Sequence, residues 1–441
     1  MIDQRQGAGT AAASAANRTL ALLSLVAMIS FIDRQVVSVL VEPIKGELGI
    51  SDTQIGLLTG VAFATFYVLG GIPLARLGDR GNRRNLIATC TAVWSVATVA
   101  CGLVHSFVHL ILARIGVAAA EAGAAPAIQS ILADIFPFSK RGGAVGILMA
   151  AQSLGVAAGL VLGGWLNQLF GWRAAFVLVG LPGLLIASAI RLWVREPRRG
   201  QLDADRPATL PGGNGLRLLL RKRSYTLILV GLMLHNLTGY AVFGWFPAFL
   251  IRVHHLSTAQ VGVLMGAPTA GGLLIGSLTA GFLADRLAPH DARWYMRITA
   301  FGCFLLGPLM ILTLLMPGVA GTIAVFSIYS IAGGLIFPPI YVAVHGLTRA
   351  DMRAVGTFLV VVVTNIGGVG FGPFLVGMLN DQLAPRYGGE AVRYSLMIAA
   401  LASPLAGFAY LLANRWIPAE FAGVQSTRYA TADKAAATVS G

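Results

Sequence analysis

Charged residues are scarce in this chain of 441 residues. Asp, Glu, Lys and Arg make up 11% of the sequence and hydrophobic residues 56%, whereas about 25% of the residues of a typical soluble domain are charged. Mean hydropathy is accordingly high, at +0.76. This composition argues against a soluble globular enzyme and indicates a protein whose surroundings are largely apolar.

Cysteine is also rare, and the usual catalytic signatures are missing. Cys90, Cys101 and Cys303 all lie in apolar stretches, which leaves no extracellular disulfide framework. The sequence has no Gly-x-x-x-x-Gly-Lys phosphate loop, His-Glu-x-x-His zinc motif or Gly-x-Ser-x-Gly elbow, so the common ATPases, metallopeptidases and serine hydrolases are excluded. We expect no catalytic residue, no metal and no cofactor. A membrane-embedded lipid-modifying enzyme, such as an acyltransferase, is the distant alternative.

Long apolar stretches dominate the sequence instead. A transmembrane helix needs about 20 mostly apolar residues, and twelve candidate stretches are centred near residues 30, 65, 95, 120, 155, 183, 238, 270, 305, 333, 367 and 403. The first stretch, over about residues 19–41, is too long for a cleaved signal peptide. The sequence therefore predicts an all-α membrane protein with twelve transmembrane helices.

The distribution of basic residues predicts the orientation of these helices. The formal net charge is +14, and cytoplasmic loops of membrane proteins are rich in Lys and Arg. With a cytoplasmic amino terminus, 25 of the 32 basic residues fall in inner segments and only Lys45, Arg173, Arg252, Arg386 and Arg393 in outer loops. The basic charge thus reflects topology rather than nucleic-acid binding. It places both termini in the cytoplasm, and we expect a multi-pass protein of the cell inner membrane.

The composition changes between the two groups of six stretches. Residues 195–223 contain Glu196-Pro197, Arg206-Pro207 and Pro211-Gly212-Gly213, which are typical of a linker without a packed core. Basic residues here either lie against anionic headgroups or form a regulatory site. The expected organisation is a cytoplasmic segment (1–18), a six-helix bundle (19–194), the linker (195–223), a second six-helix bundle (224–414) and a disordered cytoplasmic tail (415–441).

An internal repeat relates the two bundles. At an offset of 206, Ser51 maps to Ser257, Gln54-Ile55-Gly56 to Gln260-Val261-Gly262, and Asp79-Arg80 to Asp285-Arg286. At an offset near 212, Pro126 maps to Pro338 and Arg141 to Arg353. Parallel six-helix repeats are the plan of many secondary carriers, which bind substrate between the repeats near the bilayer midplane.

Several motifs resemble those of the major facilitator superfamily. Ala75-Arg76-Leu77-Gly78-Asp79-Arg80-Gly81-Asn82-Arg83-Arg84 is similar to that family's signature loop between helices 2 and 3, although Ala75 and Asn82 replace glycines, and residues 281–286 repeat it after helix 8. The glycines from Gly155 to Gly164 and from Gly368 to Gly377 resemble the motif of exporters and antiporters, with Leu160 in place of its proline. This departure weakens the inference of antiport.

Within that superfamily the first half resembles the spinster family. The similarity lies in Phe31-Ile32-Asp33-Arg34-Gln35, in residues 51–56 and in Arg114-x-Gly116-Val117-x-x-x-Glu121-Ala122. It implies proton-linked, alternating-access transport of lysophospholipids or sphingosine-phosphate-like molecules. The expected partners are thus membrane lipids, an amphipathic small molecule and protons, and we expect a monomer.

Four charged residues lie within the hydrocarbon region of the predicted helices: Asp33, Arg34, Arg114 and Glu121. Such charges cost about 2.5–3.5 kcal/mol at a helix centre and usually serve transport. Arg34 lies about 6 Å outward of the centre of helix 1, a distance that a long Arg side chain spans, and Glu121 lies near the middle of helix 4. Helices 1 and 4 line the cavity in the family that the chain resembles. We therefore predict that Arg34 and Glu121 face one another.

This pair suits a coupled carrier. Burial raises the pKa of a carboxyl group and a nearby guanidinium lowers it, so an anion that takes Arg34 would leave Glu121 ready to bind a proton, and a proton gradient would supply the energy. Arg34 would hold an anionic headgroup with its planar fork. The alternative is a static buried ion pair.

The sequence leaves two alternatives for the partner of Asp33 and two for the role of Arg114. Asp33 points about 100° away from Arg34 around the helix, so it either orients Arg34 or faces another helix, and we assign it with Glu121 to proton coupling. Arg114 lies two turns before Glu121 and either neutralises it or stabilises helix 4; we place it among the substrate-binding candidates.

The second half has no charge at the mapped positions, where Gly239, Tyr240 and Gly333 stand. It offers polar and aromatic side chains instead, which suit the apolar part of an amphipathic solute, although membrane aromatics are often packing or interface residues and His235 would serve equally as a buried hydrogen-bonding group. The substrate-binding candidates here are His235, Asn236, Tyr240, Tyr341 and Asn365.

The repeated loops supply candidates for a cytoplasmic gate. Asp79 at the end of helix 2 can lie against the positive end of a neighbouring helix, and by the repeat Asp285 can do the same; ordinary topogenic charge is the alternative. The proposed gate comprises Asp79, Arg80, Arg83, Arg141, Asp285, Arg286 and Arg353.

The substrate class stays open in two respects. An organic acid would also bind Arg34 through its carboxylate, and a cationic drug would be attracted to Glu121. A proton-coupled carrier of either is the alternative to a lipid carrier.

Overall fold

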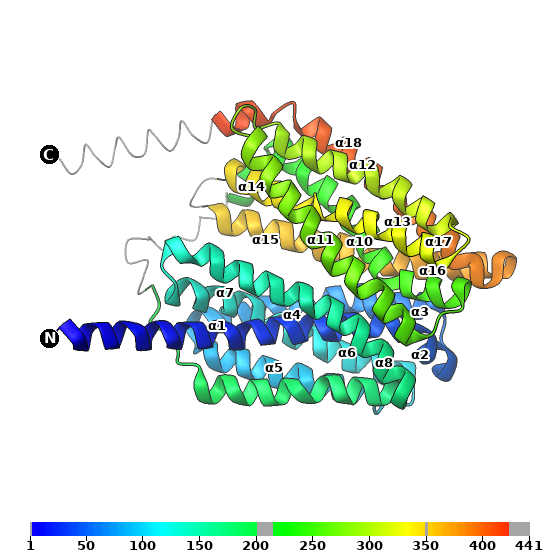
Figure 1. The fold of residues 1–441 in the computed structure, drawn as a ribbon, viewed down its shortest axis with the longest axis horizontal. Helices are drawn as coiled ribbons and strands as arrows, with labels where there is room; N and C mark the ends of the chain where they lie inside the picture. Colours follow the sequence, from blue (N-terminus) through cyan, green and yellow to red (C-terminus); the bar gives the residue numbers. More distant parts are fainter. Residues whose placement is uncertain (1, 201–214, 349–351, 423–441) are drawn as a thin grey trace. The chain divides into compact units, whose positions relative to one another are not determined.

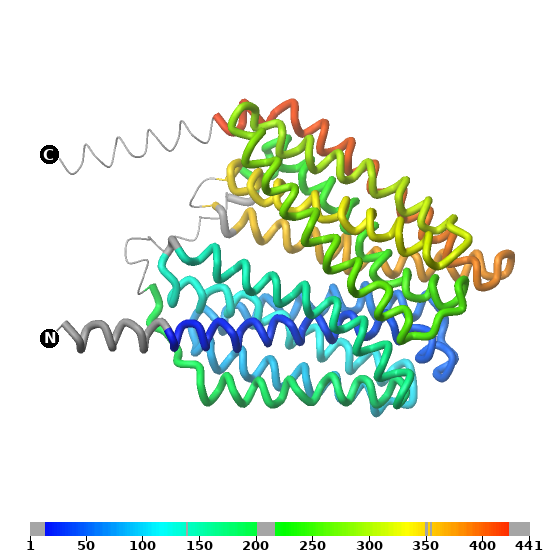
Figure 2. Tube along the Cα trace, viewed as in Figure 1, coloured from blue at the N-terminus to red at the C-terminus, as the bar shows by residue number. Residues whose placement is uncertain are grey.

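The computed structural model describes residues 2–200, 215–348 and 352–422. These residues are almost entirely helical (Figure 1), as the apolar stretches predict. Figure 2 traces the same chain as a tube from the blue amino-terminal helix to the red carboxyl-terminal one. The helices group into two compact units.

Unit 1 comprises Met1–Pro207 together with Phe243–Gly266. Its own helices are α1 (Ile2–Val39), α2 (Val41–Leu48), α3 (Asp52–Gly56), the π-helix η1 (Leu57–Val61), α4 (Ala62–Arg80), α5 (Arg83–Cys101), α6 (Phe107–Glu121), α7 (Ala124–Ile135) and α8 (Phe138–Trp193). Gly171, at φ 82°, interrupts α8, so its two parts are separate helices joined at a turn that glycine adopts easily.

Unit 2 comprises Ala208–Val242 and Ala267–Gly441. Its helices are α9 (Gly215–Leu220), α12 (Trp294–Leu315), α13 (Val319–Gly334), α14 (Phe337–Leu347), α15 (Arg353–Val363), the π-helix η3 (Thr364–Gly370), α16 (Phe371–Tyr387), the 3₁₀ turn η4 (Gly388–Glu390), α17 (Ala391–Ala400) and α18 (Ala402–Ala413). Two further helices, α10 (Arg223–His254) and α11 (Thr258–Leu287), are divided between the units. The predicted bundles of residues 19–194 and 224–414 therefore differ from the two units at the junction of α10 and α11.

Within the described residues, nine helical segments are long and apolar enough to cross a membrane. Two of them, Lys140–Trp193 with 54 residues and Val355–Ala413 with 59, are long enough for two passes each, since one pass takes about 20 residues. All twelve predicted centres lie in helices. Large apolar side chains such as Leu185 and Leu192, each 74% exposed, point outward, as lipid-facing residues do.

The internal repeat is visible in local structure. Ser51 accepts a hydrogen bond from the Gln54 amide, and the Gln54 side chain accepts one from the Ser51 amide at 2.9 Å, which starts α3. Ser257 and Gln260 form the same reciprocal pair before α11, at 3.3 and 2.9 Å. Both repeats thus begin their second helix with a capping box.

Glycines bring α8 against α1. A Cβ atom on Gly155 would lie 2.4 Å from the carbonyl oxygen of Met28, and one on Gly159 would lie 2.8 Å from that of Ile32. Only a residue without a side chain permits this approach. The glycines of the first motif therefore allow α8 to pack closely against α1. The three cysteines are buried and free.

Three expectations need correction. The first helix extends from Ile2 to Val39 rather than over residues 19–41, because the Ala-rich stretch before it favours helix. The predicted linker was expected to have no packed core, but residues at both of its ends are packed. Residues 196–200 bind within unit 1, and Leu219 is 1% exposed. Residues 201–214 lie outside the described residues.

The tail does not become irregular at Arg415, which is the third correction. After a turn at residues 414–416, helix resumes over residues 417–422. Ile417 is fully buried, and Phe421 stacks on Tyr295. Ser224 hydrogen-bonds to Glu420. Apolar residues within the polar tail explain this ordered start, and residues 423–441 lie outside the described part of the chain.

Candidate functional site

The predicted contact between Arg34 and Glu121 is present in unit 1. Nε and Nη2 of Arg34 each lie 3.0 Å from Oε2 of Glu121. Ser30, one turn before Arg34 on the same face of α1, donates its hydroxyl hydrogen to Oε1 of Glu121. The Glu121 side chain is 3% exposed and that of Arg34 is 19% exposed, so the carboxylate is the more deeply enclosed member of the pair.

A break in the helix places Glu121. It is the last residue of α6, and the chain turns at Ala122 and Gly123 before α7 begins. Gly123 is packed so closely that a Cβ atom would lie 2.8 Å from the sulfur of Cys90. The second half is interrupted at the corresponding point, between α13 and α14, where it has Gly333 instead of the acid.

Aromatic rings surround the guanidinium of Arg34. Its Cζ lies 5.5 Å from the ring centroid of Phe31, 5.1 Å from that of Phe63 and 5.0 Å from that of Tyr67. Contacts of this kind stabilise a cation in apolar surroundings. The ion pair and these rings therefore offer both charge and an apolar surface at one place.

A cavity of about 180 Å³ borders this pair. Its polar lining comes from five helices: α1 with Ser30 and Arg34, α4 with Tyr67, α6 with Glu121, α7 with Gln129, and α8 with Gln152. Trp94 of α5 also contributes. The site can accept a small polar group within reach of the ion pair.

Asp33 and Arg114 form a separate ion pair beside this site. Nη1 of Arg114 lies 2.8 Å from Oδ2 of Asp33, and the Thr98 hydroxyl donates to Oδ1 at 2.7 Å. Both charged side chains are 3% exposed, and neither is among the described residues that line the cavity. Asp33 thus faces α5 and α6 rather than orienting Arg34, and the partner of Arg114 is Asp33 rather than Glu121.

One ring connects the two ion pairs. Phe63 lies under Arg34 at 5.1 Å and under Arg114 at 5.3 Å. Phe63 is itself 3% exposed. Phe63 therefore packs against both guanidinium groups.

The predicted polar residues of the second half gather in unit 2. His235 is 5% exposed and packs edge-on against Phe337 at 5.5 Å, and Phe337 stacks on Tyr341 at 6.4 Å. Nδ1 of His235 is buried without a hydrogen-bond partner among the described residues. Three helices of this unit, α10, α14 and η3, carry these candidates.

The side-chain amides of two predicted binding residues hydrogen-bond to backbone carbonyls of their own helices. Asn236 donates to the Leu232 carbonyl at 2.7 Å and Asn365 to that of Val361 at 2.9 Å. Asn365 lies in η3, and Gly368 of the same π-helix lies against Asn236 and Tyr240, where a Cβ atom would be 2.6 Å from the first side chain and 2.9 Å from the second. Segments of π-helix are frequent at functional sites.

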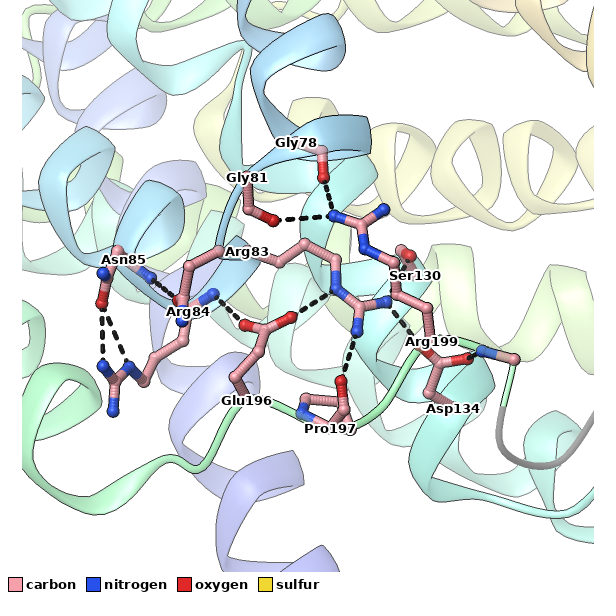
Figure 3. A network of polar contacts seen from close by, with 12 residues as sticks. Gly78, Gly81, Arg83, Arg84, Asn85, Ser130, Asp134, Glu196, Pro197 and Arg199 are labelled. Carbon is pink, nitrogen blue, oxygen red and sulfur yellow. Dashed lines mark hydrogen bonds and ion pairs between the residues drawn. The ribbon is translucent and has the colours of Figure 1, made fainter.

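Arg83, a predicted gate residue, is the centre of a polar network within unit 1 (Figure 3). It is 1% exposed, binds Asp134 of α7, and bonds to Glu196 at 2.8 Å, Ser130 at 2.8 Å and the Pro197 carbonyl at 2.9 Å. Asp134 also accepts from the Gly200 amide at 3.0 Å. Arg83 therefore ties α5 and α7 to the start of the predicted linker.

An arginine of the predicted linker also binds the end of α4. Arg199 donates to the carbonyls of Gly78 and Gly81 (Figure 3), and a cation at a helix C-terminus is favourable. Glu196 accepts from the Arg84 amide at 2.8 Å. The signature loop of residues 75–84 is thus bound to residues 196–200.

The other predicted gate residues lie at helix ends. Asp79 and Arg80 are exposed at the end of α4, and Asp285 and Arg286 are exposed near the end of α11. Arg141 donates to the carbonyls of Ala133 and Phe136 at the end of α7. Arg353 begins α15, and its side chain lies outside the described part of the structure.

Several site residues escaped the sequence analysis. Ser30 had a signal, because it lies four residues before Arg34 and thus on the same helical face. No sequence signal indicated Tyr67, Trp94, Gln129 or Gln152, because a single aromatic or amide side chain among many apolar residues does not show which way it faces. Asp134 and Glu196 were hidden because their partner Arg83 is distant in sequence.

Comparison with known proteins agrees with this architecture. Residues 23–373 match the model of the Major Facilitator Superfamily. An MFS-type efflux pump of Mycolicibacterium smegmatis is 33% identical over 394 residues, which is 89% of this chain and 91% of that protein. A probable L-galactonate transporter of Escherichia coli is 26% identical over 417 residues, 89% of this chain and 88% of that protein.

A solved structure is similar over nearly the whole chain. It is the crystal structure of a bacterial homologue of the human lysosomal transporter spinster, inward-facing and unoccupied, and it matches with a TM-score of 0.83 and 28% identity over 92% of this chain and 98% of that chain. The family match, this likeness and the apolar helices together identify the type of protein. The chain belongs to the major facilitator superfamily and is a multi-pass membrane transporter of the spinster-like type, not an enzyme.

Proposed function

We propose that this transporter couples the movement of an anionic amphipathic solute to the movement of protons by alternating access. A lysophospholipid or a sphingosine-phosphate-like molecule is the solute class that the proposal favours. The observation that carries it is the ion pair of Arg34 and Glu121, which is enclosed, borders a cavity and has no counterpart in the second half.

Competition for Arg34 would couple the two movements. The guanidinium presents a planar fork that suits phosphate or carboxylate. An anion that took this fork would leave Glu121 with the Ser30 hydroxyl as its remaining hydrogen-bond partner among the described residues. An unpaired carboxylate in such an enclosed site is costly, so it takes up a proton. Return of Arg34 to Glu121 would release both the proton and the anion.

The surroundings of the pair support an amphipathic solute. Phe31, Phe63 and Tyr67 present ring faces within 5.5 Å of the Arg34 guanidinium. Once an anion neutralises Arg34, these rings become an apolar surface next to the bound headgroup. A solute with a charged end and an adjoining apolar body would use both.

A small sugar acid is the second candidate. The E. coli relative is described as a probable L-galactonate transporter, and a carboxylate would bind the same fork. The cavity of about 180 Å³ next to the pair, with hydroxyl and amide groups in its lining, suits a compact polyhydroxylated acid. The two candidates share the Arg34 contact and differ in what lies beyond it.

Transport into proteoliposomes tests the proposal. Purified protein is reconstituted and given an imposed pH gradient, and uptake of a lysophospholipid, of L-galactonate and of a lipophilic cation is compared. We expect the gradient to stimulate uptake of one anion. Glu121→Gln should remove the dependence on the gradient, and Arg34→Ala should abolish anion uptake.

A matched control is available in another ion pair. Glu47 accepts hydrogen bonds from Trp172 and from Arg173, and these bonds, first of all that from Trp172, lower the pKa of Glu47. Its side chain is 51% exposed. Glu47→Gln should leave gradient-driven uptake unchanged. Gradient-driven uptake that survives in Glu121→Gln would refute the coupling role. Uptake of the cation alone would refute the anionic substrate.

A further inference from the structure

The cavity beside Arg34 and Glu121 has more polar groups in its wall than the ion pair needs. Gln129 of α7 and Gln152 of α8 line it, and neither side-chain amide has a hydrogen-bond partner among the described residues. Gln129 is exposed and Gln152 is half-buried. Each amide carries two N–H donors and one carbonyl acceptor. Two amides with free hydrogen-bonding capacity therefore share this wall with the ion pair.

A helix break and a close helix contact bring these amides to the ion pair. Gln129 lies in the helix that follows the break after Glu121. Gln152 precedes Gly155 by three residues, and the missing side chain of Gly155 lets α8 approach the backbone of Met28 on α1. Both glutamines are therefore placed by helices of unit 1 rather than by loops.

A third polar group of this lining also lacks a partner. Trp94 of α5 borders the cavity and is 1% exposed, and its indole N–H is buried without an acceptor among the described residues. A buried N–H group without an acceptor is costly and uncommon. A solute oxygen that reaches this wall would supply the acceptor.

The internal repeat keeps hydrogen-bonding residues at the two glutamine positions, although it does not keep the charges of the ion pair. The offset of 212 carries Gln129 to Tyr341, and the offset of 213 carries Gln152 to Asn365. Polar, uncharged side chains at the same two places in both halves indicate positions that face polar surroundings rather than lipid.

The charges of the lining restrict what a solute can carry beyond its anionic group. Arg34 and Glu121 are the charged residues among the described lining. In the proposed function, on which this inference rests, the anion takes Arg34 and a proton neutralises Glu121, so no negative charge of the lining is left for an ammonium group. An enclosed, unpaired cation is costly. Phe31 and Tyr67 do not replace the missing charge, because both rings already lie against the Arg34 guanidinium.

We propose that this cavity selects a solute whose anionic group is followed directly by an uncharged, hydroxylated group, and that Gln129, Gln152 and the Trp94 N–H bind its hydroxyl oxygens. A phosphoglycerol headgroup and a sugar acid share this chemistry, whereas phosphocholine and phosphoethanolamine carry an ammonium group. Amides donate and accept hydrogen bonds, as hydroxyl groups do. The volume of about 180 Å³ equals about six water molecules at about 30 Å³ each, which suits a group of a few carbon and oxygen atoms.

Equilibrium binding tests this selection without a pH gradient. The protein in lipid nanodiscs is titrated calorimetrically with three lysolipids that share one short acyl chain and carry a phosphoglycerol, a phosphocholine or an unsubstituted phosphate. We expect the phosphoglycerol lipid to bind at least about tenfold tighter than the phosphocholine lipid, through two or more added hydrogen bonds. Gln129→Leu and Gln152→Leu should each weaken phosphoglycerol binding by about two- to tenfold, the effect of one lost hydrogen bond. Binding of the unsubstituted phosphate lipid should not change.

Further measurements separate hydrogen bonding from a general loss of structure. Trp94→Phe keeps an aromatic ring but removes the N–H, and should weaken phosphoglycerol binding about as much as either glutamine change. Gln168→Leu is the matched control on α8, because Gln168 is exposed and is not among the described residues that line this cavity; it should change none of the three affinities. L-Galactonate that displaces the phosphoglycerol lipid would extend the recognition to free sugar acids, and a lipid that stays bound would confine it to the headgroup.

Two results would overturn the proposal. One is binding of the phosphocholine lipid that is as tight as that of the phosphoglycerol lipid, and the other is a phosphoglycerol preference that survives in the double variant Gln129→Leu/Gln152→Leu. The unsubstituted phosphate lipid separates this failure from failure of the proposed function. If Arg34→Ala abolishes its binding, the anion site stands whichever headgroup is preferred, whereas binding that survives in Arg34→Ala would contradict the anion site itself.

Discussion

Two carboxylates of α1 and α6 are neutralised in different settings. Glu121 pairs with Arg34, which is 19% exposed and borders a cavity, whereas Asp33 pairs with Arg114 where both side chains are 3% exposed. The guanidinium of Arg34 lines the cavity, and that of Arg114 does not. The exchange of partners that the proposed coupling requires would therefore be open to Arg34 and Glu121. The pair of Asp33 and Arg114 is suited to holding α1, α5 and α6 together.

This difference predicts the behaviour of Asp33 variants. Asp33→Asn leaves Arg114 charged and enclosed without an anion, which costs about 3–5 kcal/mol for a buried pair. We expect a clearly lower midpoint of thermal unfolding for the protein in detergent. The double variant Asp33→Leu/Arg114→Met removes both charges and should recover most of the stability. An equal loss in the single and double variants would contradict the view that charge pairing, rather than side-chain shape, holds these helices.

At the scale of helices, interruptions of the helices and close contacts between them position the polar residues of the site. The end of α6 at Glu121 and the π-helix at Asn365 place polar groups where continuous α-helix would not. The glycine face of α8 brings it against α1 beside Phe31, whose Cβ would lie 3.0 Å from a Cβ on Gly155. The position of Arg34 therefore depends on how α8 supports α1.

Substitution of glycines on α8 checks this dependence. Gly155→Ala would place a methyl group 2.4 Å from the Met28 carbonyl oxygen, whereas Gly146→Ala on the same helix meets nothing within 4 Å. We expect Gly155→Ala to lower the midpoint of thermal unfolding and the rate of solute uptake. Gly146→Ala should be neutral or slightly stabilising, because alanine favours helix by about 1 kcal/mol over glycine. Equal effects of the two variants would refute a contact-specific role for Gly155.

At the scale of the molecule, the signature loop is bound within its own unit. Arg83, Asp134 and Glu196 join α5 and α7 to the segment that follows α8. Residues 196–200 are therefore a fixed part of unit 1 rather than a loose start to a linker. Of the proposed gate residues, Arg83 acts in this network, while Asp79 and Asp285 are exposed at helix ends and stay predictions.

The orientation in the membrane is also a prediction at this scale. The 25 basic residues of the predicted inner segments, against five in the outer loops, favour cytoplasmic termini. Alkaline phosphatase fused after Gly441 should be inactive, and the same enzyme fused after Gly49, between α2 and α3, should be active. Fluorescent protein fusions at both sites provide the opposite readout. Activity at the C-terminal fusion would reverse the assignment of inner and outer sides.

Much of this protein was determined by sequence alone, for a physical reason. An apolar segment of 20 residues in lipid must satisfy its backbone internally and so becomes helix, which predicts the spans and, with the repeat, two six-helix halves. Charges in hydrocarbon must find partners, so the scarcity of charge made Arg34 and Glu121 conspicuous. Helical phase also puts Ser30 on the face of α1 that carries Arg34, a signal that the sequence analysis missed.

Only the tertiary structure decided which partners the remaining charges have. Asp33 lies about 100° from Arg34 around the helix, an angle that admits several neighbours, and only packing shows that α5 and α6 supply Thr98 and Arg114. Arg252 binds Asp52, 200 residues away, because residues 243–266 of the second half pack within unit 1. Sequence requires that these charges be neutralised, but the three-dimensional arrangement of helices selects the group that neutralises each one.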